Sequence, residues 1–428
     1  MNIKMENNKT LATFARHMIC PKYFSDSKLS VNGKLSVGAA GNEYFNSYVF
    51  RMSSKHYTQD SIPDEYVLLE KIKRALGRCG RKKPLLLLSD GKDSMSLALA
   101  YKKAGLSVNT LTFLRKDDHK LKEYVKSIAT QLGHTAYFVD VDTIIEKFNS
   151  KIFLNSCTKM PNLVMDQGYL FFLFGLRAFF DETGFLPKDY AVIDGLGNDE
   201  TFGYLPSIDQ VKSFKLSLLN LWKFRPNSLP GLRWYIRSPA ESHGDLSALS
   251  CFFPLRGSFP LNSFFSKINK SMNEVEFIDF RAFSRGSFHD HQCMMGKTRA
   301  AAKELGCEVY FPWIDEELAN YVFNLPLEFK FDFKLYENKT LLRRLLIKEL
   351  NWSQSKRGVD LYFDINLDKF LNEVVLQVVP IDVIEKISKN RLLPLYVKKR
   401  ASLELMNFYG FCLGQGYTHQ EIKRLLCK

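Results

Sequence analysis

The feature that most constrains the fold is an unbroken apolar run that ends in a small polar loop. Residues 84–88 contain no polar side chain, which is typical of a strand buried on both faces of a parallel sheet. A polar loop, residues 89–94, follows at once. Apolar residues then recur at helical spacing from Met95 until Gly105, a residue type that often ends a helix. The order strand, tight loop and helix is therefore predicted.

The residues of this loop predict an anion site. Backbone N–H groups at the start of a helix attract negative charge, together with the helix dipole. Ser89 and Ser94 can donate to phosphate oxygens, and Gly91 lets the backbone approach them. Lys92 adds a positive charge. Asp93 adds a carboxylate, and a carboxylate beside a phosphate requires a cation between the two groups. Mg²⁺ is the natural candidate for this cation. An ordinary turn with a capping serine or aspartate is the alternative.

Strand and helix patterns alternate after the loop. Strands are predicted over residues 107–113, 135–141 and 190–193, and helices over residues 121–132 and 167–180. A helix that begins near Pro63 precedes the first strand. This alternation predicts an α/β fold with a doubly wound parallel sheet, in which ligands bind beyond the carboxyl ends of the strands.

A second loop follows the strand at residues 190–193. It reads Asp194-Gly195-Leu196-Gly197-Asn198-Asp199-Glu200. Taken alone, the run is also compatible with a simple turn. Next to the first loop it predicts a metal site, because Asp199 can supply a second carboxylate to a magnesium ion shared with Asp93.

Both loops resemble those of one enzyme family. Residues 89–94, Ser-Asp-Gly-Lys-Asp-Ser, resemble the Ser-Gly-Gly-x-Asp-Ser loop of the ATP pyrophosphatases, the PP-loop family, with Asp90 in place of the first glycine. The second loop resembles the Ser-Gly-Glu-Gly-x-Asp-Glu run in the synthetase domain of asparagine synthetase, with Asp194 for the serine and Leu196 for the first glutamate. Residues 306–315, 339–343 and 356–358 are similar to later motifs of that domain, in the same order.

The resemblance implies a reaction and a set of site residues. Members of the family adenylate a carboxylate with ATP, release pyrophosphate, and let an amine displace AMP to form an amide. An AMP-forming carbon–nitrogen ligase that uses ATP and Mg²⁺ is thus expected. The ATP-binding residues implied are Leu88, Ser89, Asp90, Gly91, Lys92, Asp93, Ser94, Phe113, Asp194 and Gly195. The metal ligands implied are Asp93 and Asp199, and the catalytic residues are Lys356, Glu308 and Lys92.

The acceptor amine is expected to differ from that of the glutamine-dependent asparagine synthetases. Those enzymes carry a glutaminase domain with a cysteine at the second position, where this chain has Asn2, so ammonia made from glutamine within this chain is not expected. Leu196 replaces the glutamate that the family places near the amine. The candidates for the general base are Glu308, His289 and His291. An apolar wall of Leu196, Phe202 and Trp313 would receive the carbon skeleton of a metabolite or peptide.

The composition favours an anionic partner but does not distinguish one class of anion from another. The formal net charge of +14 fits ATP but also a nucleic acid. Interleaved basic and aromatic residues at 222–235 leave open an enzyme of the PP-loop family that modifies tRNA or a nucleobase, although nucleic acid is not the favoured partner. The departures at Asp90, Asp194 and Leu196 leave open a nucleotide-binding regulator without catalytic activity.

Three regions are predicted along the chain. Residues 1–62 form a short N-terminal region in which residues 44–50 favour a strand or hairpin, residues 63–365 form the PP-loop domain, and residues 366–428 form a helical region. The most apolar segment, residues 169–180, is too short to span a bilayer. The eight cysteines include no Cys-x-x-Cys pair, and residues 1–10 lack the apolar core of a signal peptide, so a cytoplasmic protein is expected.

Overall fold

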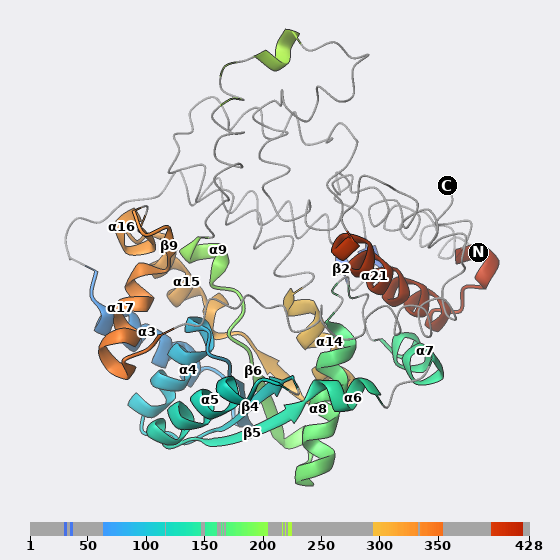
Figure 1. The fold of residues 1–428 in the computed structure, drawn as a ribbon, viewed down its shortest axis with the longest axis horizontal. Coiled ribbons are helices and arrows are strands. Elements are labelled where there is room, and N and C mark those ends of the chain that lie inside the picture. The colour runs from blue at the N-terminus through green and yellow to red at the C-terminus, as the bar shows by residue number, and fades with distance from the viewer. Residues whose placement is uncertain are drawn as a thin grey trace.

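A parallel sheet forms the centre of the fold (Figure 1). The computed structural model describes residues 30–31, 35–36, 63–115, 117–146, 150–160, 164, 166, 168–203, 216, 219, 221–224, 294–332, 334–353 and 395–422. Its five-stranded sheet has the order β5-β4-β3-β6-β7. The strands are β3 (Lys83–Leu87), β4 (Asn109–Leu114), β5 (Thr135–Asp140), β6 (Tyr190–Ile193) and β7 (Glu308–Tyr310), and all neighbours are parallel.

The central strand, β3, is buried on both faces. Leu85 pairs with Val192 of β6 and lies with it in one hydrophobic cluster, whereas the next residue, Leu86, pairs with Ile193 and lies in the opposite cluster. Successive side chains of a strand point to opposite faces, so a strand covered on both sides has no position for a polar residue. This explains the unbroken apolar run in the sequence.

Helices cover both faces of the sheet. One hydrophobic cluster joins the sheet to α3 (Glu65–Gly77), α4 (Lys92–Lys103), α5 (His119–Leu132), α15 (Glu316–Phe323) and α17 (Thr340–Leu350). The other joins it to α6 (Val141–Glu146), α7 (Ser150–Thr158), α8 (Tyr169–Thr183), α14 (Met295–Leu305) and α21 (Leu395–Gly414). The smaller elements are β1 (Ser30–Val31), β2 (Leu35–Ser36), α9 (Asp199–Phe202), α16 (Leu327–Lys330), β8 (Phe331–Asp332) and β9 (Glu337–Asn338).

The connections reverse direction between β3 and β6. The chain passes from β3 outward to β4 and β5, and then returns to place β6 on the other side of β3, with β7 beyond it. In parallel sheets this reversal leaves a crevice at the carboxyl ends of the two strands, where ligands bind. Both glycine-bearing loops leave the sheet at this point, residues 89–91 after β3 and residues 194–198 after β6.

The predicted α/β class and parallel sheet are confirmed, with one strand more than the sequence patterns indicate. β7 is only three residues long and begins with a charged side chain, so its pattern carries little strand signal. The predicted strand or hairpin at residues 44–50 lies outside the described residues. Among the helices that the structure describes, none is both long and apolar enough to cross a membrane.

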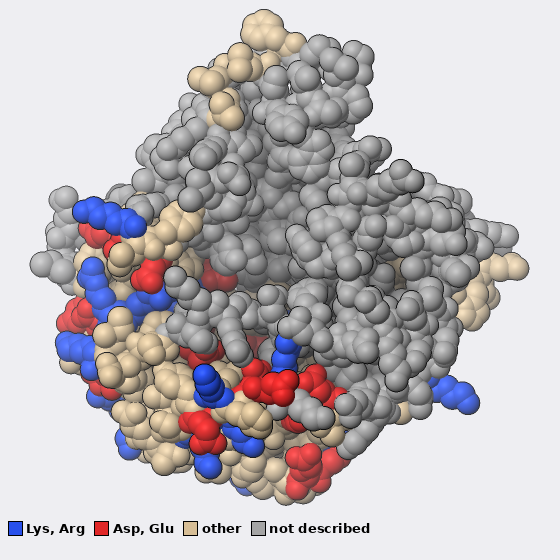
Figure 2. Space-filling model, in the orientation of Figure 1, with Lys and Arg blue, Asp and Glu red and all other residues tan. Residues whose placement is uncertain are grey.

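The charge of the described surface is mixed. Figure 2 shows Lys and Arg side chains interspersed with Asp and Glu side chains over the described part of one face. On this part of the surface, therefore, the net positive charge of the chain is not gathered into a single basic patch.

A buried histidine links the first helix after the loop to the neighbouring strands. The carbonyl of Ala98, in α4, can only accept, so His134 Nε2 at 2.9 Å must carry the proton. His134 Nδ1 then accepts from the Val108 amide at 3.4 Å. Burial lowers the pKa of His134 from 6.5, with the Lys102 charge adding to this effect and the Ala98 hydrogen bond opposing it.

We expect this histidine to make the fold sensitive to mild acid. Its neutral form is favoured in the folded state, so its contribution to stability is complete above pH 6.5 and is lost as the pH falls from there toward the lowered pKa. His134→Gln should lower the free energy of unfolding by about 1–3 kcal/mol at pH 7.5 and flatten its decline between pH 7.5 and 5. Urea unfolding across this range measures both effects. His119→Gln, at an exposed position, should follow the wild type, and an unchanged decline in His134→Gln would contradict the assignment.

Candidate functional site

The first loop is closed by hydrogen bonds between its serines. Ser94 Oγ accepts from the Ser89 amide at 3.0 Å, and Ser89 Oγ accepts from the Gly91 amide at 3.2 Å. α4 then begins at Lys92, with Gly91 as its N-cap and no side chain capping the helix. The first N–H groups of a helix have no partner within it, so this turn is arranged to meet an anion.

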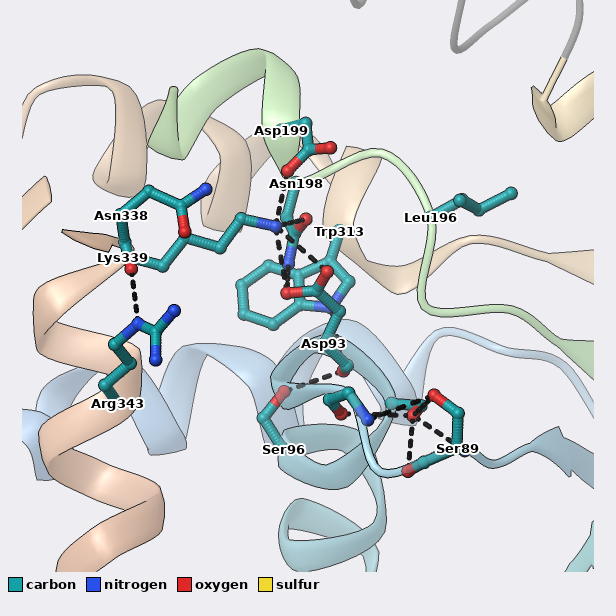
Figure 3. Close-up of polar contacts among 12 residues, drawn as sticks. Ser89, Asp93, Ser96, Leu196, Asn198, Asp199, Trp313, Asn338, Lys339 and Arg343 are labelled. Atoms are coloured by element: carbon teal, nitrogen blue, oxygen red, sulfur yellow. Dashed lines mark hydrogen bonds and ion pairs between the residues drawn. The ribbon is translucent and has the colours of Figure 1, made fainter. Parts of the chain in front are cut away.

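An ammonium group lies between the two carboxylates that the sequence singles out (Figure 3). Lys339 Nζ lies 2.9 Å from both oxygens of Asp93 and 2.6 Å from Oδ1 of Asp199. It also donates to Oδ1 of Asn198, whose Nδ2 donates to Asp93 Oδ1 at 2.7 Å. The Lys339 side chain is 1% exposed. The start of α4, the second loop and the start of α17 thus share one cation.

The backbone before α17 sets the position of this lysine. Lys339 has φ 60° and ψ 44°, a left-handed conformation that costs an L-residue roughly 1–2 kcal/mol. Its carbonyl accepts from the Arg343 amide at 2.9 Å, while Arg343 Nε donates to the Asn338 carbonyl at 2.8 Å. A residue in a strained backbone conformation that is held by hydrogen bonds to its own carbonyl and to the preceding one is typical of a functional position.

The second loop packs directly on the first turn of α4. A Cβ atom added to Gly195 would lie 3.1 Å from Ser94 N and 3.2 Å from Asp93 C, so any larger residue would force this backbone to shift. Gly197 has φ +104°, a conformation that favours glycine, and a Cβ there would lie 2.6 Å from Ile314 Cγ2. Gly195 therefore allows the second loop to lie against α4, and Gly197 allows it to lie against Ile314.

The Asp194 carboxylate is buried and faces inward. Its Oδ2 accepts from Thr298 Oγ1 at 2.7 Å and its Oδ1 accepts from the Leu196 amide at 3.1 Å. Burial raises the pKa of its carboxyl, and the Thr298 hydrogen bond, the charge of Lys297 and the Leu196 amide oppose that shift. The carboxylate thus serves to shape the loop from inside.

The two lysines of the site have opposite pKa shifts. Burial lowers the pKa of Lys92 to about 8, and the charges of Lys339 and Arg343 add to the effect. Burial also disfavours the charged form of Lys339, but the carboxylates of Asp199 and Asp93 outweigh it and raise the pKa of Lys339. Lys339 is therefore a fixed cation, whereas Lys92 can lose its charge in weakly alkaline solution.

The expected magnesium pair does not fit this arrangement. Mg²⁺ needs an open coordination sphere of oxygens at about 2.0–2.1 Å. Here the position between Asp93 and Asp199 is taken by Lys339 Nζ. No group of three or more His, Cys, Asp or Glu side chains within the described residues is placed to hold a metal ion. The described residues therefore leave no open position for a metal between Asp93 and Asp199.

No protein-family model and no curated protein matches this chain. The site is accordingly defined by its own geometry. Of the residues expected from the sequence, the structure brings together those of the first loop, Gly195 and Asp199. Leu88 lies in the hydrophobic core with its side chain 3% exposed, and Asp90 contributes its carbonyl, which accepts from Trp352 Nε1 at 2.9 Å. Phe113 is half-buried against Phe172 and Gly175.

Glu308 lies far from the loops, which argues against its expected role as general base. It opens β7 and pairs in register with Ala191 near the start of β6, whereas the loops leave from the carboxyl ends of the strands. Its exposed carboxylate lies 3.5 Å from Lys82 Nζ. The expected catalytic Lys356 and the alternative bases His289 and His291 lie outside the described residues.

The expected apolar wall is only partly available to a substrate. Phe202 and Trp313 are fully buried and contact each other at 5.9 Å between ring centroids. Trp313 Nε1 also donates to the Asp93 carbonyl at 3.4 Å, so the indole ring packs against the first turn of α4 and is not open to a substrate. Leu196 is half-buried, and in Figure 3 its side chain points away from Lys339.

Sequence reasoning missed Asn198, Lys339 and Arg343 as members of the site. Lys339 and Arg343 lie in the run that resembles a Lys-x-x-Leu-Arg motif, and this was the available signal. Nothing in the spacing of the chain places them beside Asp93, since they are 246 residues or more further along. Asn198 had no signal beyond its place between Gly197 and Asp199.

We expect Gly195→Ala to weaken binding of the expected nucleotide. The added methyl would push the second loop off the first turn of α4 and disturb the N–H groups there. ATP affinity should fall by about tenfold or more, equivalent to ~1.4 kcal/mol, in a calorimetric titration. Gly77→Ala is the matched control, because a methyl there has no atom within 4 Å. Equal affinity in Gly195→Ala and wild type would show that the contact between the loops is not needed.

The lowered pKa of Lys92 predicts a pH dependence of the same affinity. The ammonium is charged below pH 8 and neutral above it, so its attraction for phosphate is lost as the pH rises from 7 to 9. ATP affinity should fall by up to about tenfold over this range in the wild type. Lys92→Arg, which stays charged, should show a much smaller change. A wild-type affinity that is flat across these pH values would contradict the assignment.

Proposed function

We propose that this protein is an ATP-dependent ligase that adenylates a carboxylate, releases pyrophosphate and transfers the acyl group to an amine. The observation that carries the proposal is the cluster that the basic side chains of Lys92 and Arg343 form at the uncapped start of α4. This cluster lies where the order of the sheet reverses, at the carboxyl ends of β3 and β6. The resemblance of both loops to those of PP-loop synthetases supports the same reaction.

The chemistry follows from where charge develops. When the carboxylate attacks the α-phosphate of ATP, the bond to the β-phosphate breaks and negative charge grows on the leaving pyrophosphate. Fixed positive groups aimed at that charge lower the barrier. Lys92 and the first N–H groups of α4 supply such groups, and Ser89 and Ser94 carry hydroxyl groups beside them. The acyl-adenylate then carries AMP as a good leaving group for the amine.

The proposed partners are a carboxylate and an amine of small-molecule or peptide size. Leu196 stands in the second loop where the similar enzymes have an acid near the amine. An apolar side chain packs against a carbon skeleton but neither attracts nor deprotonates ammonium. We therefore propose an organic amine as acceptor, with Lys356 stabilising charge on the acyl-adenylate.

Product analysis tests this function directly. The full-length protein is incubated with ATP, Mg²⁺ and a panel of carboxylates and amines, and pyrophosphate, AMP and coupled products are followed by mass spectrometry. Equal amounts of pyrophosphate and AMP are expected, whereas ADP and phosphate would refute the mechanism. Stimulation of pyrophosphate release by RNA would instead favour the alternative of a tRNA-modifying enzyme.

Two variants make the test specific to this site. Asp93→Asn removes a charge from the group that orients Lys339, and turnover should fall by about 100-fold or more. Asp189→Asn makes the same chemical change at an exposed position just before β6, at the opposite end of the strand, and should retain turnover. An equal loss in both variants would show that the activity does not come from this site.

A further inference from the structure

The Lys339 ammonium has a complete set of partners. A lysine side chain offers three N–H donors and no acceptor. The side chains around Nζ are those of Asp93, Asp199 and Asn198, and each supplies an oxygen within hydrogen-bond distance. The ammonium is almost fully removed from solvent. The Lys339 ammonium therefore makes the contacts that a bound cation would make, although it is covalently part of the chain.

We propose that Lys339 is the resident cation of the acid pair Asp93 and Asp199, and that the protein holds no divalent metal between these carboxylates while Lys339 is in place. The inference depends on the geometry of these side chains alone and not on the ligase reaction. It explains the disagreement between the metal pair expected from the sequence and the arrangement in Figure 3.

Attachment to the chain gives the lysine an advantage over a free ion. An ion from solution competes with a group whose effective concentration at the site is set by the fold. Asn198 strengthens this arrangement, because its Oδ1 accepts from Lys339 while its Nδ2 donates to Asp93. A metal would have to displace the ammonium from these oxygens, and with it the side chain of Lys339, the residue that precedes α17.

Removing the ammonium should turn the same oxygens into a metal site. One positive charge between two carboxylates leaves a net charge of −1, and its loss leaves −2 on two carboxylate side chains that are 32% and 30% exposed. Like charges this close raise each other's free energy, and a divalent cation relieves the repulsion. The Asn198 carbonyl oxygen, released from Lys339, would add a third oxygen ligand of the kind that Mg²⁺ and Mn²⁺ accept.

The test is a titration of the full-length protein with Mn²⁺ in the absence of nucleotide, with free Mn²⁺ measured by electron paramagnetic resonance. Wild type should show no saturable site that depends on Asp93 and Asp199. Lys339→Met should bind one Mn²⁺ per chain, with an affinity at least about tenfold above any wild-type binding. Adding Asp199→Asn to Lys339→Met should remove the gain.

Lys297→Met is the matched control. Lys297 is also buried, with its side chain 4% exposed, but its ion pair is with a single carboxylate, Asp166, at 3.5 Å. The same substitution there should create no Mn²⁺ site. Gain of Mn²⁺ binding in both variants would show that the loss of any buried ammonium is enough, and would overturn the specific role of Lys339.

Thermal unfolding provides a second measurement, which tests the proposal even if a variant is destabilised. Lys339→Met and Lys339→Gln should melt below the wild type, and Mn²⁺ should restore their stability, whereas NaCl of equal ionic strength should not. Wild-type melting should be insensitive to Mn²⁺ without nucleotide. Saturable Mn²⁺ binding by the wild type that is lost in Asp93→Asn would overturn the proposal, as would the absence of any Mn²⁺ effect on both Lys339 variants. No ATP is present, so either failure leaves the proposed ligase reaction to its own test.

Discussion

The contact between Lys339 and the carboxylates of Asp93 and Asp199 is the interaction on which the arrangement of the site depends. It joins the first turn of α4, the second loop and the first turn of α17, which come from distant parts of the chain. The Lys339 ammonium, with its side chain 1% exposed, is taken out of water, which is unfavourable unless it finds partners, and the two carboxylates supply them. The contact therefore helps to set the relative position of the two loops, and it supports the left-handed backbone at Lys339.

The sheet explains why such a group can form at this place. Parallel strands end at one edge, and the reversal of order between β3 and β6 opens that edge for loops from both strands. β3 is buried on both faces, so its end is rigid and its loop emerges at a fixed point. Gly195 and Gly197 then let the loop from β6 come within contact distance of α4 and of Ile314.

The sequence predicts the local parts of this site and not the long-range ones. The unit of β3, loop and α4 is readable because the burial of residues 84–88 and the start of the helix are encoded in consecutive residues. The position of Lys339 cannot be read from consecutive residues, because it depends on how α17 packs against α3 and α4. The expectation that Glu308 acts in catalysis also depended on a long-range feature that the sequence does not show. Which end of a strand a residue occupies depends on register, and pairing with Ala191 puts Glu308 at the amino end.

The departures from the similar PP-loop motifs also acquire a physical meaning. An aspartate in place of glycine or serine would be expected to repel phosphate, but the inward-facing Asp194 carboxylate has its oxygens bound to Thr298 and to the Leu196 amide. Asp90 is fixed through its carbonyl by Trp352. The carboxylates of Asp93 and Asp199, beside the start of α4, face Lys339. Lys92 and Arg343 lie nearby, so the start of α4 also has basic side chains of the kind that a phosphate site requires.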